Sequence, residues 1–184
     1  MMTLNHGFSG YICGRVAMPV LKRYAPISQG AMGWAFFIGA MMPDGDVLTR
    51  LVGGRGNYFG GAWYSHRQFS HSLLGTLVYA LLIAAVVFAP VVWRHERRWR
   101  AYAWTVGCLW VGGWLHLLGD MMTPGRPLPI FWPLPETFGA WGHIGWFSPY
   151  LLVIFLAVLI ADVILRGVAR MGSERWRMGV AALT

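Results

Sequence analysis

Charge is scarce in this sequence. Only 12% of its 184 residues are charged, whereas a soluble domain carries about 25%. Hydrophobic residues make up 57%, and the mean hydropathy is +0.50. The 11 Trp fit a chain in contact with lipid, because Trp concentrates at lipid–water boundaries. The composition therefore predicts a membrane protein rather than a soluble domain.

Cysteine is scarce as well. The chain has two, Cys13 and Cys108, both within apolar segments and not in a CxxC pair. This argues against a disulfide framework, and we expect both thiols to behave as small buried hydrophobic groups. The N-terminal segment lacks the basic start and the small-residue cleavage site of a signal peptide, so we expect no cleavage there.

The apolar residues are gathered into five segments. These are residues 7–21, 28–42, 72–93, 101–122 and 144–165. The last three are long enough to cross a bilayer, which takes about 20 apolar residues. The first two span roughly 22 Å each as helix, so they either cross a locally thinned bilayer or pair as a shallow hairpin. We predict an all-α fold: an integral membrane bundle of about five apolar helices, the first two short, in a single domain over residues 1–184.

The net charge of +8 does not indicate nucleic-acid binding, because the basic residues cluster beside the apolar segments. Ten of them lie on one side of the five expected crossings: Lys22, Arg23, Arg94, Arg97, Arg98, Arg100, Arg166, Arg170, Arg175 and Arg177. The other side has four: Arg50, Arg55, Arg67 and Arg126. The positive-inside rule then predicts an outer N-terminus and a cytoplasmic C-terminus.

The same topology places eight potential metal ligands on the extracytoplasmic side. They are His6, Asp44, Asp46, His66, His71, His116, Asp120 and His143. Ionisable groups at membrane depth are costly and usually mark a functional site. The pattern predicts a membrane-embedded metal site, with His143 the weakest member because a belt or substrate-contact role suits it equally.

The spacing of His116 and Asp120 is the most specific local signal. Residues four apart lie on one face of a helix, so both side chains are able to bind one metal ion. Two other interpretations stay open. In one, Asp120 orients His116 as a metal ligand without binding the metal itself. In the other, the two residues form a buried hydrogen bond between helices.

Two further motifs flank the second and third segments. Asp44 and Asp46 follow a Pro, and a tight turn through Gly45 would aim both carboxylates at one point; an ordinary polar turn is the alternative. In the stretch 65–72, we expect Ser70 to cap the third helix and His71 to lie in its first turn, with His66 converging on it from the loop. Arg67 would offer a planar fork to a phosphate or carboxylate, or else face lipid headgroups.

The loops carry weaker signals. The Gly-rich stretch 47–65 is expected to be a mobile loop or lid. Trp132, Trp141 and Trp146 are expected at the membrane interface. Glu136 is either a general base or an ordinary solvated side chain, and we favour the second.

Taken in order, His6, the Pro43–Asp46 stretch, the stretch 66–72 and the stretch 116–125 resemble one family. It is the LexA-regulated, inner-membrane metal-dependent hydrolases of bacteria and archaea, whose pattern is an early His, PDxD, HRxxTHS and HxxxDxxTxxG. Ser70 stands where the family has Thr, which keeps the hydroxyl. The resemblance covers His6 to Pro133 and implies a multi-pass protein of the inner membrane.

A fainter likeness runs to zinc-dependent phospholipase C and P1-type nucleases, where an HxxxD pair followed by Pro helps to bind several zinc ions. His116, Asp120 and Pro124 match that pattern, but the later His is absent and Arg126 is nearby instead. This implies one or two divalent ions, with zinc the expected metal, rather than three.

The leading hypothesis is a metal-dependent hydrolase that cleaves a phosphoester of a lipid or lipid-linked substrate at the outer leaflet. The expected ligand pool is His6, Asp44, Asp46, His66, His71, His116 and Asp120. We expect Asp46 or Asp120 to act as a catalytic carboxylate and Arg67 to hold the phosphoryl charge. The alternatives are a metal or ion transporter and a structural membrane protein whose metal staples helices together. The sequence gives no oligomeric state.

Overall fold

The computed structural model describes residues 3–47, 66–123, 127–138 and 149–181. The regular secondary structure of these residues is helical, and their one β feature is an isolated bridge between Leu128 and Phe138. The elements follow in the order α1 (Thr3–Leu21), α2 (Gln29–Met41), η1 (Met42–Val47), η2 (Phe69–His71), α4 (Leu73–Val86), α5 (Ala89–Val92), α6 (Arg98–Met121) and α7 (Pro149–Ala181), of which η1 and η2 are short 3-10 helices. The expected all-α class is confirmed for the described residues.

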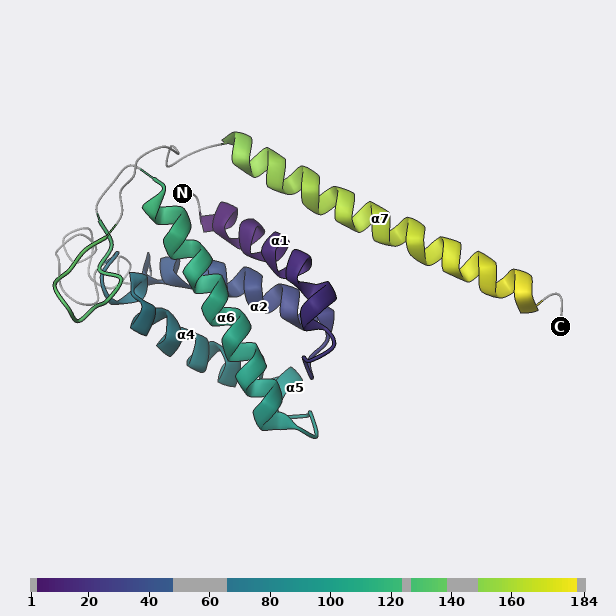
Figure 1. Ribbon diagram of the computed structural model, residues 1–184, viewed down its shortest axis with the longest axis horizontal. Helices are drawn as coiled ribbons and strands as arrows, with labels where there is room; N and C mark the ends of the chain where they lie inside the picture. Colours follow the sequence, from purple (N-terminus) through teal and green to yellow (C-terminus); the bar gives the residue numbers. More distant parts are fainter. Residues whose placement is uncertain (1–2, 48–65, 124–126, 139–148, 182–184) are drawn as a thin grey trace. The chain divides into compact units, whose positions relative to one another are not determined.

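The chain falls into two compact units, Met1–Ser148 and Pro149–Thr184. In the first unit, α2 packs against both α1 and α6, and α4 also packs against α6 (Figure 1). The second unit is the single long helix α7. That the two units form one domain stays a prediction.

The expected helix over residues 72–93 is wrong as a single element. It ends at Val86, and the separate four-residue helix α5 begins at Ala89. Pro90 explains the break, because it has no N–H to donate and its ring clashes with the preceding turn, while it fits well in the first turn of α5. None of the described helices is both long enough and apolar enough to cross a membrane.

Helices α2 and α6 approach closely through glycine. A Cβ at Gly39 would lie 2.2 Å from the carbonyl oxygen of Leu109, and a Cβ at Gly112 would lie 2.6 Å from that of Phe36. Small residues that let backbones meet are typical of helix contacts in membranes. This contact fixes the end of α2 beside the end of α6, where the candidate site lies.

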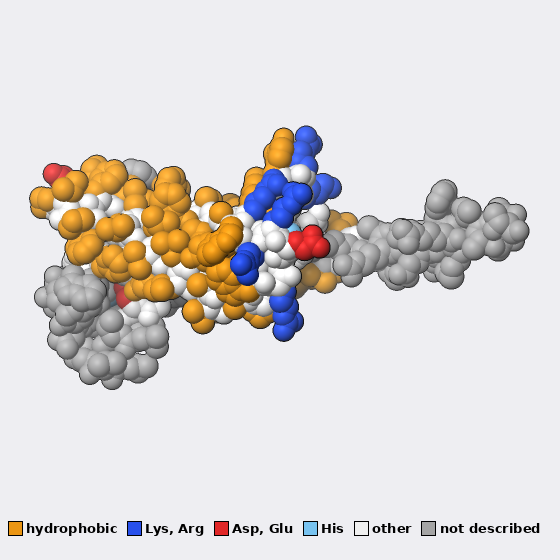
Figure 2. All heavy atoms as spheres, turned by 90° about the horizontal axis from the view of Figure 1, so that it is seen from below, with side chains coloured by type: hydrophobic (Ala, Val, Ile, Leu, Met, Phe, Trp, Pro, Cys, Tyr) orange, Lys and Arg blue, Asp and Glu red, His pale blue; other side chains and the backbone are white. Residues whose placement is uncertain are grey.

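The first unit has two chemically different ends. At one end, Arg100 of α6 donates a hydrogen bond of 3.0 Å to the backbone oxygen of Tyr24, so the turns that carry the basic residues lie together. Figure 2 shows Lys and Arg side chains gathered there, while hydrophobic side chains cover much of the rest of the described part of this face. Val16, Leu82 and Val86 are among those most exposed. Apart from His95, the described His and Asp side chains of the first unit gather at the other ends of the same helices.

Candidate metal centre

Asp44 and Asp46 lie in the η1 turn that follows α2. Asp44 Oδ1 is 3.6 Å from His71 Nε2, whereas Asp46 Oδ2 is 3.4 Å from His71 Nδ1. The expectation that the turn aims both carboxylates at one point is therefore wrong. The turn places them against opposite nitrogens of the His71 ring.

His71 and Ser70 belong to the short η2 helix that precedes α4. Ser72, not Ser70, is the N-cap of α4: its hydroxyl accepts a hydrogen bond of 2.9 Å from the N–H of Gly75. The expected cap at Ser70, with His71 in the first turn, is wrong. Because Ser72 satisfies the open helix end, the Ser70 hydroxyl is available to donate to Asp46 and to lie 2.8 Å from His71 Nδ1.

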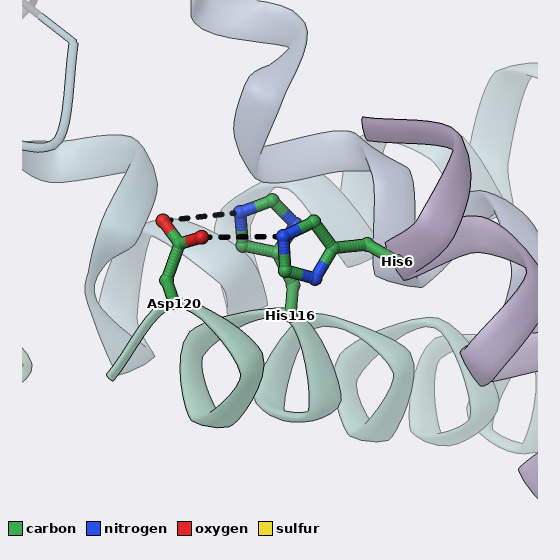
Figure 3. A group of neighbouring side chains, drawn as sticks. All are labelled: His6, His116 and Asp120. Carbon is green, nitrogen blue, oxygen red and sulfur yellow. Dashed lines mark hydrogen bonds and ion pairs between the residues drawn. The ribbon is translucent and has the colours of Figure 1, made fainter. Parts of the chain in front are cut away.

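His116 and Asp120 lie on one face of α6, as their spacing predicts. His116 Nε2 is 3.8 Å from Asp120 Oδ2. His6, near the start of α1, stacks on His116 with ring centroids 3.9 Å apart. Its Nε2 lies 3.2 Å from Asp120 Oδ1, and Figure 3 shows the Asp120 carboxylate facing both rings. Helices α1 and α6 thus meet at one carboxylate, through residues that are 114 positions apart in the sequence.

Three donor atoms converge on one point from three elements. His71 Nε2 and His116 Nε2 are 3.3 Å apart, and Asp44 Oδ1 is 3.6 Å from each of them. A tetrahedral zinc ion with bonds of about 2.0 Å holds its ligand atoms about 3.3 Å apart. Asp120 Oδ2 lies nearby, 3.6 Å from His71 Nε2 and 3.8 Å from His116 Nε2. The donor set and its dimensions therefore fit a divalent cation.

The hydrogen bonds of the two rings strengthen this assignment. His116 Nδ1 lies 2.8 Å from the carbonyl oxygen of Ala40, which only accepts, so the ring proton is on Nδ1 and Nε2 carries a lone pair. His71 Nδ1 faces Ser70 and Asp46 in the same way. Two bare Nε2 atoms at 3.3 Å would repel each other, so a proton or a cation must lie between them.

The surrounding charges hold a proton on His71 when no metal is bound. Burial of the ring would lower the pKa of His71, but its contacts with Asp44 and Asp46 outweigh burial and raise that pKa to about 9. Burial likewise would raise the pKa of Asp46, yet hydrogen bonds to His66 and His71 hold it well below its ordinary value. His66 Nδ1 lies 2.8 Å from Asp46 Oδ1.

Arg67 is buried and contacts the carboxylates of both Asp46 and Asp120. Its guanidinium Nη2 donates to Asp120 Oδ2 at 2.8 Å, and its backbone N–H donates to Asp46 Oδ2 at 3.3 Å. Its backbone φ of 62° is in the left-handed region, which is strained for a residue other than Gly. The structure thus places Arg67 against Asp120, where it pairs with a carboxylate.

The structure brings together seven of the eight residues in the predicted ligand set. Three groups of them are close enough to hold an ion: His6 with His116 and Asp120, Asp44 with His71 and His116, and Asp46 with His66 and His71. Three histidines, His6, His71 and His116, are completely buried. His143, Trp141, Trp146 and the stretch 48–65 lie outside the described residues. Glu136 is exposed, as favoured.

Two polar groups of the site were not anticipated in these roles. The hydroxyl of Ser70 was expected only as a helix cap, and the carbonyl of Ala40 carries no side-chain signal at all. The carbonyl is open because the last carbonyls of a helix have no partner within it. Its position near the end of α2 is the one feature that sequence reasoning had available.

Together, the fold and the site define an all-helical protein with an apolar exterior and a buried cluster of His and Asp that is able to hold a cation. The family model described as YdjM inner membrane protein matches residues 1–184. The chain therefore belongs to the YdjM inner membrane protein family, which agrees with the inner-membrane family that its motifs resemble. No curated protein and no solved structure matches the chain. The fainter likeness to phospholipase C and P1 nuclease is not shown by these comparisons.

Proposed function

We propose that the chain is a multi-pass, metal-dependent hydrolase of the inner membrane that cleaves a phosphoester of a lipid or lipid-linked substrate on the extracytoplasmic side. The observation that carries this proposal is the triangle of Asp44 Oδ1, His71 Nε2 and His116 Nε2, with edges of 3.3 to 3.6 Å. Two His and one carboxylate, with a fourth position left for water, are a ligand set typical of catalytic zinc.

The residues around the triangle have separable roles in this proposal. A divalent ion held by Asp44, His71 and His116 would lower the pKa of a bound water towards ~7 and polarise a phosphoryl oxygen. Asp120 Oδ2 faces the same space, 3.6 Å from His71 Nε2, and would accept the proton of the attacking water. It is a candidate catalytic residue rather than the fourth ligand.

Asp46, Ser70 and Arg67 are positioning residues in this scheme. Asp46 and Ser70 hold the far side of the His71 ring, which fixes its orientation and makes Nε2 a better donor. Arg67 pairs with Asp120 and brings positive charge to the site, which favours an anionic substrate such as a phosphoester. Asp46 therefore fits better behind His71 than as the general base.

A lipid substrate is supported by the surroundings of the site. The chain belongs to an inner membrane protein family, and many large hydrophobic side chains of the described residues are exposed, as on the face that Figure 2 shows. The ligand groups of the described residues gather at one end of the helices. This suits a site at headgroup depth better than the continuous polar path that an ion transporter needs.

The proposal is tested first by metal analysis of the purified protein. We expect bound zinc or a similar divalent ion in the wild type, and its loss in His116→Ala and Asp44→Ala. The matched control is His95→Ala, because His95 lies at the basic end, where its Nδ1 accepts a hydrogen bond from the N–H of Arg97. Equal metal content in all four proteins would disprove the metal site.

The second test separates catalysis from a structural role. The complete burial of His6, His71 and His116 favours a helix-stapling metal as the alternative function, because structural sites are closed. We expect Asp120→Asn to keep the metal but to abolish release of the phosphate headgroup from phospholipid vesicles. If the wild type itself releases no headgroup while chelation lowers its melting temperature, the structural role is correct.

A further inference from the structure

A pocket of about 650 Å³ lies between α2 and α4 in the first unit. Its walls are the side chains of Phe37, Ile38, Met41, Tyr79 and Ile83. Each of these side chains is half-buried, so the pocket is open to the surroundings of the protein. Among the residues that line the pocket, one carries a carboxylate. It is Asp46, in the η1 turn at the end of α2.

The pocket therefore ends at the candidate metal centre. The Asp46 carboxylate at this end contacts His66 and, through its other oxygen, His71. From there the walls run along α2 towards Phe37 and along α4 towards Ile83, away from the site and towards the basic end of the helices. A ligand that fills the pocket must then have a polar end beside the η1 turn and an apolar body.

We propose that this pocket binds the hydrocarbon chain of a membrane lipid, with the lipid headgroup held at the η1 turn. The inference rests on the proposed function in so far as the bound lipid is the substrate. It goes further because it assigns the selection of the lipid's hydrocarbon chain to the α2–α4 pocket, and in particular to Ile38, Tyr79 and Ile83.

Two observations favour a lipid chain over a helix of this or another protein. A helix about 10 Å wide occupies roughly 400 Å³ per turn, so the pocket holds less than two turns. The outer face of α4 beside the pocket is apolar, with Leu82 and Val86 exposed to 58% and 72%. A ligand that reaches the pocket past these side chains comes from an apolar phase rather than from water.

Photocrosslinking tests the proposal directly. We would place p-benzoylphenylalanine at Ile83, inside the pocket, and at Leu82 as the matched control, which is its neighbour on α4 but points outwards. After illumination in detergent micelles that contain a trace of phosphatidylglycerol, so that no bilayer surrounds position 82, we expect a mass increase of one lipid at position 83, well above that at 82. Equal lipid adducts at the two positions, or an adduct to a peptide of α7 or of another chain, would overturn the proposal.

Filling the pocket gives an independent readout. In this assay an added unlabelled phospholipid competes with a diazirine-labelled phospholipid for the pocket. Ile83→Trp and Ile38→Trp should each abolish that competition, whereas Leu82→Trp should leave it unchanged. Helix content by circular dichroism shows which variants fold, and the two pocket positions lie on different helices. Competition that persists in a folded pocket variant contradicts the proposal.

Both measurements are made on metal-free and metal-loaded protein without any hydrolysis assay. Lipid binding in the pocket without headgroup release would leave this inference standing and defeat the hydrolase. Headgroup release that stays unchanged in both Trp variants would support the hydrolase and defeat this inference.

Discussion

The His71 ring is the residue on which the candidate site depends most. Asp44 faces its Nε2, while Asp46 and Ser70 face its Nδ1. In the metal-free protein Asp44 and Asp46 raise the pKa of the ring to about 9, so the ring keeps its proton at neutral pH. A divalent ion bound at Nε2 must displace that proton, because only a neutral imidazole is a ligand.

We therefore predict that metal binding releases a proton from His71 at neutral pH. The apparent affinity should rise about tenfold per pH unit up to the pKa of about 9 and then level off, because above it the ring is already neutral. Isothermal titration calorimetry in buffers of different ionisation enthalpy measures the proton count.

Asp46→Asn is the informative variant for this prediction. Loss of the carboxylate removes one of the groups that raise the pKa of His71, so fewer protons should be released at pH 7. The affinity above pH 9 should still fall, since the ring is less well oriented. An affinity that does not change with pH in the wild type would rule out His71 as a ligand.

At this scale the sequence predicted the residues better than their contacts. The i,i+4 spacing was enough to place His116 and Asp120 on one face of a helix. It did not show that His6 reaches Asp120, because that contact joins residues 114 positions apart and depends on how α1 packs. Ser70 was assigned to the wrong role because two hydroxyls, Ser70 and Ser72, compete for the N-cap and the sequence does not rank them.

Helices α2 and α6 hold the two halves of the ligand triangle in register. Gly39 and Gly112 let the backbones touch, and the same contact brings His116 Nδ1 to the carbonyl of Ala40. Helix α2, which leads into the η1 turn that carries Asp44, is thus joined just beside the site to α6, which carries His116. The stability of this contact and metal binding should be linked.

We predict that Gly39→Ala destabilises the protein by about 1–3 kcal/mol and lowers its metal content, because the new Cβ would meet the Leu109 carbonyl at 2.2 Å. Thermal unfolding followed by circular dichroism, with metal analysis, checks both effects. The control is Gly107→Ala on α6, where a Cβ meets nothing within 4 Å. It should be neutral or stabilising by up to about 1 kcal/mol.

The sequence predicted helix positions more reliably than helix ends. The apolar segments gave α1, α2 and α6 within a few residues. The third segment was taken as continuous because it holds no charge, yet Pro90 divides it into α4 and α5. Hydropathy does not register a missing N–H, which is why the break was overlooked.

On the scale of the whole molecule, most of the described basic residues of the first unit lie at one end, with His95 beside them. The seven His and Asp residues of the candidate site lie at the other end, together with Arg67. The hydrogen bond from Arg100 to Tyr24 ties the basic turns together at one end, and the His6–Asp120 contact closes the other. Because loops rich in Lys and Arg usually lie on the cytoplasmic side of a membrane, we expect the basic end to face the cytoplasm.

We predict that the two ends face opposite sides of the membrane. In a Cys13→Ala, Cys108→Ala background, a membrane-impermeant thiol reagent should label Glu136→Cys in intact spheroplasts but Glu96→Cys only after permeabilisation. The two glutamates are matched in type and both exposed. Labelling of both in intact spheroplasts would contradict the topology.

The left-handed backbone of Arg67 carries a cost that the fold does not require. Such a conformation costs about 1–2 kcal/mol for a residue with a side chain, and Gly would adopt it freely. Arg67→Gly relieves the strain but removes the guanidinium that pairs with Asp120. If that variant melts at a higher temperature and keeps its metal, yet no longer releases the phosphate headgroup that the wild type releases, then natural selection has kept an unfavourable residue here for its chemistry and not for the folding of the chain.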